Sequence, residues 1–103
     1  MTLERSRMTR SDVINILTDF KKLSAEKYGI ILLGVFGSVA RNQINEHSDV
    51  DIVLQTQTPD PYLIVHIKED LERRLIHSVD IVRLRKNMNP SLKQRIEQEA
   101  IYV

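Results

Sequence analysis

The sequence has no cysteine and no tryptophan among its 103 residues. The lack of cysteine excludes a disulfide framework and any thiolate-bound metal in this chain, and it suits a reducing compartment. No apolar run approaches the roughly 20 residues that cross a bilayer, and no apolar signal-peptide core follows the basic N-terminus. We therefore expect a cytoplasmic protein that makes no use of a membrane.

An excess of charge of one sign is also missing. Fifteen Lys and Arg residues are balanced by fourteen Asp and Glu residues, which gives a net charge of +1. This balance provides no overall attraction to nucleic acid, so nucleic acid is not an expected partner. The composition, with 42% hydrophobic residues, is that of a globular protein, and the length predicts a single domain over 1–103 with a flexible lead-in at 1–9.

Hydrophobic periodicity predicts that helices and strands alternate along the chain. The predicted elements are a helix at about 10–28, a strand at 30–36, a short helix starting near Ser38, a strand at 50–54, a helix after Asp60-Pro61, a strand at 78–84 and a helix at about 90–100. This order predicts a small α/β (α+β) domain in which helices flank a short mixed sheet.

The first helix has the clearest local signals. Thr9 followed by Asp12 resembles an N-terminal capping pair, and Gly29 can adopt the left-handed conformation that ends a helix. Its predicted buried stripe consists of Val13, Ile16, Leu17, Phe20 and Leu23.

The stretch GVFGSVARNQINEHSDVDIV at 34–53 contains groups suited to binding phosphate and metal. A glycine at the end of a buried strand lets backbone N–H groups approach an anion, and a following helix start adds partial positive charge. Gly37 and Ser38 stand at such a point. A strand followed by Gly-Ser is more often a plain turn, so this pair alone is weak evidence.

Two aspartates, Asp49 and Asp51, follow Gly37-Ser38 after ten intervening residues. Alternate side chains of a strand share a face, so both carboxylates are expected on one face of the 50–54 strand, opposite the core. Adjacent carboxylates repel each other unless a cation offsets their charge, and Mg²⁺ binds one or two carboxylates together with substrate phosphates. The structural alternative for Asp49 is a turn or cap residue after Ser48.

A third acid, Asp80, interrupts the apolar run SVDIV. We expect this strand to be buried, and an uncompensated buried carboxylate costs on the order of several kcal/mol, which is comparable to the stability of a small domain. We therefore favour a functional role for Asp80 over a structural one.

These motifs resemble the signature of the polymerase-β-like nucleotidyltransferase superfamily: Gly-Ser, a spaced Asp-x-Asp, and a third Asp on a later strand. The form FGSVAR, then SDVDIV, then VDIVRL is similar to that of the minimal nucleotidyltransferases, the MntA-like antitoxins encoded beside HEPN-domain toxins. The similarity runs from about residue 10 onward. Asn42 departs from the pattern, since relatives often have glycine there, but asparagine tolerates the same left-handed conformation.

The resemblance implies an enzyme and a donor site. Gly37 and Ser38 would hold the β- and γ-phosphates of ATP, and Arg41 would add a phosphate contact. The implied reaction is Mg²⁺-dependent transfer of AMP to a tyrosine hydroxyl of a HEPN ribonuclease toxin, which blocks the toxin.

The resemblance also implies a metal site. Asp49 and Asp51 would bind Mg²⁺, with two ions expected. Asp80 would complete the second metal site and position or deprotonate the attacking hydroxyl.

The acceptor is expected to be a separate macromolecule, or a partner or second copy of the chain would complete the cleft, because little sequence follows the third acid. Two alternatives are an antitoxin that acts by contact alone, through the apolar end 101–103 or the basic residues Arg83, Arg85 and Lys86, and a transferase acting on a small molecule or RNA. The presence of all three acids argues against the first alternative. The charge balance argues against unaided RNA binding.

Overall fold

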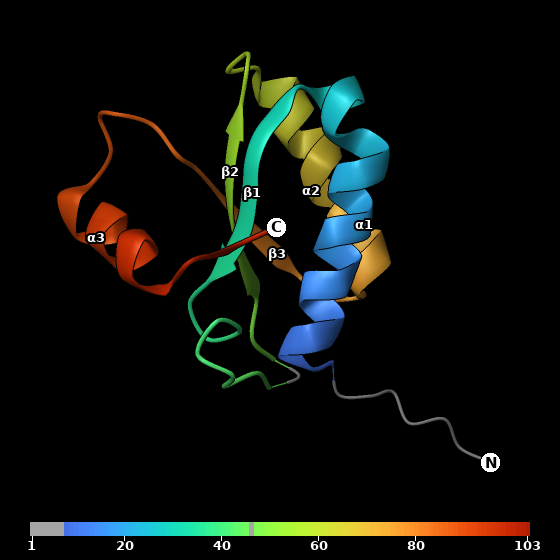
Figure 1. The fold of residues 1–103 in the computed structure, drawn as a ribbon, viewed down its shortest axis with the longest axis vertical. Helices are drawn as coiled ribbons and strands as arrows, with labels where there is room; N and C mark the ends of the chain where they lie inside the picture. The colour runs from blue at the N-terminus through green and yellow to red at the C-terminus, as the bar shows by residue number, and fades with distance from the viewer. Residues whose placement is uncertain (1–7, 46) are drawn as a thin grey trace.

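The computed structural model describes residues 8–45 and 47–103 (Figure 1). The elements in these residues are α1 (Arg10–Tyr28), β1 (Ile30–Phe36), β2 (Val50–Thr56), α2 (Pro61–Leu75), β3 (Val79–Arg83), α3 (Pro90–Glu99) and β4 (Ile101–Tyr102). The predicted α+β fold with a mixed sheet is confirmed. Within the described part of the chain, no helix has the length and apolar character needed to cross a membrane.

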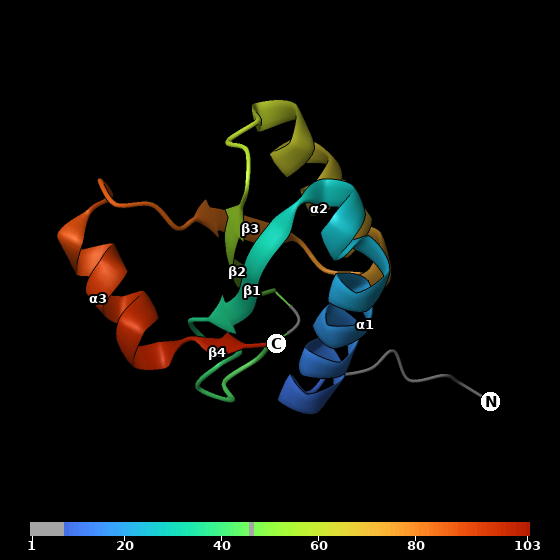
Figure 2. The ribbon, with the colours of Figure 1, turned by 45° about the horizontal axis from the view of Figure 1, so that its top comes forward.

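The four strands form one mixed sheet in the order β3-β2-β1-β4. β1 pairs antiparallel with β2 and with β4, whereas β2 pairs parallel with β3. The parallel pair is possible because α2 carries the chain back to the same end of the sheet between the two strands. Figure 1 shows α1 and α2 on one face of the sheet and α3 on the other, and Figure 2 shows β4 beside β1.

The sheet separates two hydrophobic clusters. The larger cluster lies beneath α1 and α2 and takes residues such as Ile52 and Leu54 from β2. The smaller cluster lies under α3 and consists of Phe36, Val53 and Ile96, with partly buried neighbours around them. The predicted alternation along β2 is therefore correct, and Asp51 shares the α3 face with Val53.

Local signals fix the ends of α1 as predicted. Thr9 Oγ1 accepts a hydrogen bond from Asp12 N at 3.1 Å, and Asp12 Oδ2 accepts one from Thr9 N at 3.0 Å. Gly29 ends the helix with a φ of 64°. Most of the predicted lead-in, residues 1–7, lies outside the described residues. Its last two residues are not a loose lead-in, because Met8 packs against the larger cluster and Thr9 caps α1.

Two predictions of local structure are wrong, and one short element was not predicted. Leu23 is 70% exposed, and Ser24 is buried on that side of α1 instead. No helix follows Ser38: residues 37–42 form successive turns. Gly37 and Asn42 have positive φ values, 73° and 63°, which leaves only four residues between them, about one helical turn. The C-terminal end is a short strand, β4, that pairs with Gly34 and Val35 of β1.

Candidate functional site

Gly37, directly after β1, allows a carboxylate to approach the backbone closely. Its φ is 73°, and a Cβ placed there would lie 2.1 Å from Asp51 Oδ2. Any other residue would be strained by the positive φ and would also collide with Asp51. Glycine at this position is therefore required by the geometry around Asp51.

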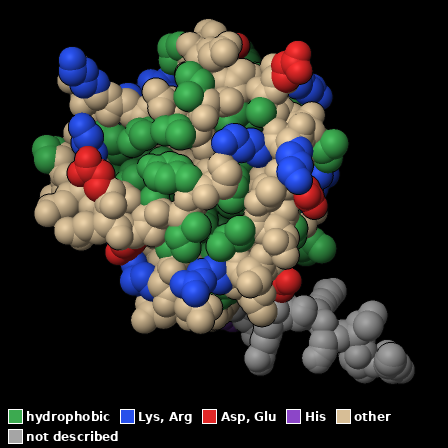
Figure 3. All heavy atoms as spheres, viewed as in Figure 1, with side chains coloured by type: hydrophobic (Ala, Val, Ile, Leu, Met, Phe, Trp, Pro, Cys, Tyr) green, Lys and Arg blue, Asp and Glu red, His purple; other side chains and the backbone are tan. Residues whose placement is uncertain are grey.

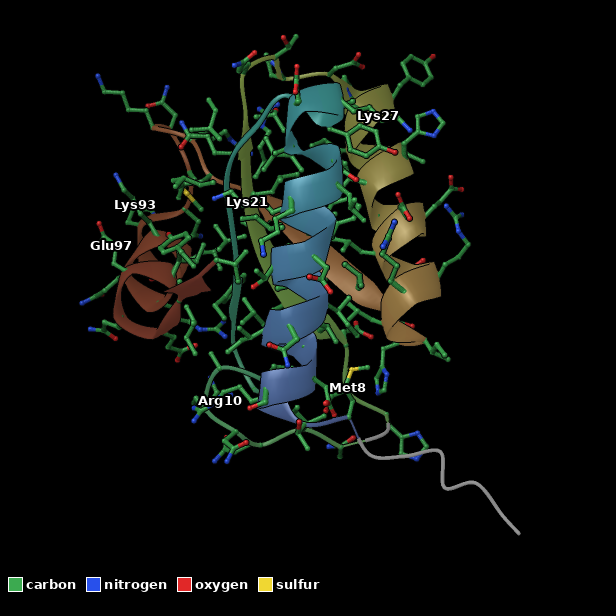
Figure 4. All side chains as sticks on the ribbon, turned by 45° about the vertical axis from the view of Figure 1, so that its right-hand side comes forward. Met8, Arg10, Lys21, Lys27, Lys93 and Glu97 are labelled. Carbon is green, nitrogen blue, oxygen red and sulfur yellow. The ribbon has the colours of Figure 1, made fainter. Side chains whose placement is uncertain are left out.

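The loop that follows Gly37 is held by its own hydrogen bonds and by α1. Arg41 N donates to the Gly37 carbonyl at 3.0 Å, and Gln43 N donates to the Ser38 carbonyl at 2.7 Å. Arg10, labelled at the start of α1 in Figure 4, donates from Nη1 to the Ala40 carbonyl at 3.0 Å. These bonds fix the position of the Gly37 N–H relative to the strand ends.

Two of the residues predicted to contact phosphate converge on one carboxylate. Gly37 N donates to Glu99 Oε1 at 3.1 Å. Arg41 Nη1 lies 3.1 Å from both carboxylate oxygens of Glu99. Ser38, the third predicted residue, lies in the same turn and is half-buried. We call Gly37, Ser38 and Arg41 the anion pocket, because two of them, Gly37 and Arg41, donate to an anionic group.

The three predicted acids lie around the adjoining ends of β2 and β3. Asp51 and Asp80 are direct register partners in the parallel β2–β3 pair. Asp49 immediately precedes β2 and is two residues from Asp51, so it lies toward the same face. Asp51 is half-buried, whereas Asp49 and Asp80 are exposed.

The three acids affect one another electrostatically at Asp51. Burial raises the pKa of the Asp51 carboxyl, and the negative charges of Asp80 and Asp49 raise it further. Arg95 on α3 and Arg41 lower this pKa. Asp51 is thus the residue at which the charges of the site converge.

The argument that Asp80 must be functional because it is buried is wrong. Asp80 is exposed, because β3 is the edge strand of the sheet and α3 leaves this part of its face open to solvent. A charged group in contact with water carries no large desolvation cost. What singles out Asp80 is its position beside Asp51.

The acids fit a hard divalent cation by their chemistry. Among residues 8–45 and 47–103, no three Asp, Glu, His or Cys side chains are already gathered as a complete ligand group. Mg²⁺ does not need such a group, because it is usually held by one or two carboxylates, substrate phosphates and water. Burial, followed by repulsion from Asp80 and Asp49, raises the pKa of the Asp51 carboxyl, and a bound cation would stabilise the charged form, so Asp51, Asp49 and Asp80 are the candidate ligands.

Sequence reasoning missed three residues of this region. Glu99 and Arg95 come from α3, and Arg10 comes from the first turn of α1. Each lies far along the chain from its partner, for example 62 residues in the Glu99–Gly37 hydrogen bond. No local spacing in the sequence signals such contacts.

The sequence matches a known protein family over most of the chain. The family model described as "Polymerase beta, Nucleotidyltransferase" matches residues 18–103. The chain is 38% identical over 96 residues to "Putative protein adenylyltransferase MJ0128" of Methanocaldococcus jannaschii, covering 92% of this chain and 98% of that one. It is 32% identical over 97 residues to "Protein adenylyltransferase MntA" of Thermococcus cleftensis, covering 93% and 97%.

Solved structures have the same fold. A structure described as a "putative minimal nucleotidyltransferase" superposes with a TM-score of 0.78 at 30% identity, covering 93% of this chain and 97% of that one. A chain of a toxin–antitoxin structure with AMP-PNP superposes with a TM-score of 0.65 at 23% identity, and the match covers 90% of this chain and 70% of that one. A complex of a tri-AMPylated Shewanella oneidensis HEPN toxin with an MNT antitoxin contains a chain that superposes with a TM-score of 0.57 at 22% identity. The match covers 90% of this chain and 66% of that one. The last two likenesses concern the fold alone.

Proposed function

The chain belongs to the polymerase beta nucleotidyltransferase family, and from this membership we propose that it transfers AMP from ATP to a tyrosine hydroxyl of a HEPN-type toxin. The names of its relatives, which are protein adenylyltransferases, support a protein as the acceptor. The complexes of fold neighbours with a HEPN toxin and with AMP-PNP support the choice of acceptor and donor. The proposed role of the chain is that of an antitoxin.

The observation that carries the proposal is the position of the anion pocket beside the acids. The Gly37 N–H and the Arg41 guanidinium converge on the Glu99 carboxylate, and the Asp51 carboxylate lies close against Gly37. A nucleotide bound with its β- and γ-phosphates in the pocket would direct its α-phosphate toward Asp49, Asp51 and Asp80. Such a site offers donors for phosphate oxygens and carboxylates for a cation.

The proposed step is an in-line displacement at the α-phosphorus. The tyrosine oxygen forms a bond to the α-phosphorus, the bond from that phosphorus to the bridging oxygen breaks, and pyrophosphate leaves with the electron pair. The hydroxyl proton passes to a carboxylate, for which Asp80 is the candidate, because it is exposed and adjacent to Asp51. Bound Mg²⁺ would supply positive charge to the phosphates. Asp49 and Asp51 are the residues proposed to hold it, and Asp80 would complete the site for a second ion.

The anion pocket would act mainly by positioning. A fixed backbone N–H and a guanidinium orient the leaving pyrophosphate without reorganising during the reaction. Arg10 contributes indirectly, because its hydrogen bond to the Ala40 carbonyl holds the loop that carries Gly37 and Arg41.

The test is a transfer assay with ATP labelled at the α-phosphate, Mg²⁺ and a HEPN-domain toxin from the same genome. We expect label on the toxin with the wild-type chain and none with the Asp49→Asn, Asp51→Asn double variant. A matched control carries Asp19→Asn and Glu26→Gln, two exposed residues of α1 whose neutralisation changes the net charge equally. This control is expected to transfer like the wild type.

Two other results would overturn the proposal. If the double variant still neutralises the toxin as well as the wild type, the chain acts by contact alone. If label appears on RNA or on a small molecule and not on the toxin, the acceptor is wrong.

A further inference from the structure

The carboxylate in the anion pocket belongs to the chain itself. Glu99, the last residue of α3, accepts hydrogen bonds from Gly37 N and from Arg41 Nη1, each at 3.1 Å. Its side chain is 21% exposed and that of Arg41 is 44% exposed. The two donors that the proposed function assigns to a triphosphate are therefore both hydrogen-bonded to Glu99.

The carboxylate and a phosphate cannot use these donors together. Gly37 has a single N–H, and it points at Glu99 Oε1. A phosphate oxygen at the same donor would place two anionic groups in contact, and like charges at that distance repel each other. Binding of either anion must therefore displace the other.

We propose that Glu99 is an internal competitor for the triphosphate: it fills the anion pocket of the free protein and must leave before phosphates bind. The proposal rests on the proposed function for the identity of the incoming anion. It makes Glu99 a residue that sets nucleotide affinity. It also predicts that a polyphosphate displaces Glu99 more readily than a singly charged anion does, because its additional negative charge is attracted more strongly to Arg41.

The neighbourhood of Glu99 allows such an exchange without unfolding. The ion pair with Arg41 is partly exposed, and exposed pairs contribute little to stability, so breaking it costs little. α3 ends at Glu99, and Ala100 is already extended, with φ −65° and ψ 138°. Arg95 lies one helical turn earlier, with its Nη2 4.0 Å from Glu99 Oε1, and it can retain the displaced carboxylate.

The experiment measures binding of inorganic tripolyphosphate and of Mg²⁺–ATP by titration calorimetry. Glu99→Gln keeps the shape of the side chain and removes its charge. We expect it to bind both ligands about twofold to fivefold more tightly than the wild type, the range expected for losing one partly exposed charge interaction. Glu99→Ala, which removes the competing group entirely, is expected to change affinity in the same direction.

Glu97→Gln provides the matched control. Glu97 lies on the same helix, is exposed, and extends outward from α3 in Figure 4. The substitution changes the net charge as Glu99→Gln does, but at a residue outside the anion pocket. Its affinity for both ligands is expected to equal that of the wild type.

A second background tests whether the effect passes through Arg41. In an Arg41→Gln chain, Glu99 loses its cationic partner, so adding Glu99→Gln should change tripolyphosphate affinity less than it does in the wild type. An undiminished change would mean that Glu99 acts by general repulsion and not by occupying the pocket.

The results separate this inference from the proposed function. Unchanged or weaker tripolyphosphate binding by Glu99→Gln and Glu99→Ala overturns the inference, even if the chain adenylylates its toxin. Tighter tripolyphosphate binding supports the inference, even if no AMP is transferred, in which case only the proposed function fails.

Discussion

Asp51 is held where its own charge is unfavourable. Burial and two acidic neighbours raise its pKa, so the folded protein takes up a proton there more readily than the unfolded chain does. Between the unfolded and the folded pKa, the folded state binds more protons, and stability therefore falls as the pH rises through that interval.

Asp51→Asn is expected to stabilise the metal-free protein at pH 7. The melting temperature should rise by about a few degrees, because the substitution removes a repelled, half-buried charge. The gain should vanish below about pH 3, where Asp51 is protonated in both states. Thermal unfolding in the presence of a chelator, from pH 7 to below pH 3, measures the change in melting temperature, and Asp19→Asn is the control at an exposed aspartate. A gain that persists at low pH would show that charge is not the cause.

Gly37→Ala and Gly29→Ala separate backbone strain from the collision with Asp51. Both glycines have positive φ, but a Cβ at Gly29 meets its nearest neighbour at 3.5 Å, against 2.1 Å at Gly37. We expect Gly29→Ala to cost about 1–2 kcal/mol of unfolding free energy and to leave tripolyphosphate binding intact. Gly37→Ala should cost more and abolish binding. Chemical denaturation and calorimetry measure the two effects, and equal costs would contradict the collision.

The role of a single residue could be predicted from the sequence where that residue type fits few backbone conformations. It could not be predicted where the exposure of the side chain depends on the position of its strand in the sheet. A glycine at the end of a buried strand predicted that a backbone N–H lies close to an anion, and the Gly37 N–H donates to the Glu99 carboxylate. The anion that was predicted there, a nucleotide phosphate, stays a prediction. The prediction that Asp80 is buried was wrong, because an apolar strand sequence does not reveal which strand forms the edge of the sheet.

The short strand β4 joins α3 to the rest of the protein. It pairs with Gly34 and Val35 of β1, and Val103 N donates to the Leu33 carbonyl at 2.9 Å. Lys21 of α1, labelled in Figure 4, donates from Nζ to the Val103 carbonyl at 2.8 Å. These contacts place the end of α3, and with it Glu99, beside Gly37.

Gly34→Ala is expected to detach β4. A Cβ at Gly34 would lie 2.7 Å from the Ile101 carbonyl oxygen and 2.9 Å from Tyr102 Cδ1. We expect a loss of roughly 1–3 kcal/mol, typical of overpacking, with faster amide exchange in α3 and β4 than in α1. Tyr102→Ala should not rescue it, because the closest clash is with backbone. Rescue would mean that the tyrosine ring alone causes the conflict.

Elements were predictable where several residues share one periodicity. The three long helices and the three longer strands each have such a pattern, and their caps and turns agree with it. β4 has only two residues, too few for a periodicity. The expected helix after Ser38 had a suitable composition, but the positive φ at Gly37 and Asn42 leaves only four residues between them, and these form turns.

At the scale of the whole molecule, the sheet serves two separate purposes. Its α1–α2 face packs the larger cluster, whereas its α3 face holds the smaller one and the polar site at one end. Figure 3 shows apolar side chains at the surface between α3 and α1, with Lys and Arg side chains around them. The fold and the proximity of the acids could be predicted from motifs. The hydrogen bonds of Glu99 to Gly37 and Arg41 could not, because they depend on how α3 and β4 pack against β1.

The most direct measurement is a calorimetric titration of ATP, with and without Mg²⁺, into the wild-type chain and the Asp49→Asn, Asp51→Asn variant. If these acids hold the cation that accompanies the phosphates, Mg²⁺ should strengthen ATP binding to the wild type by about tenfold or more and have little effect on the variant. An equal Mg²⁺ effect on both proteins would contradict a metal–nucleotide site built on β2.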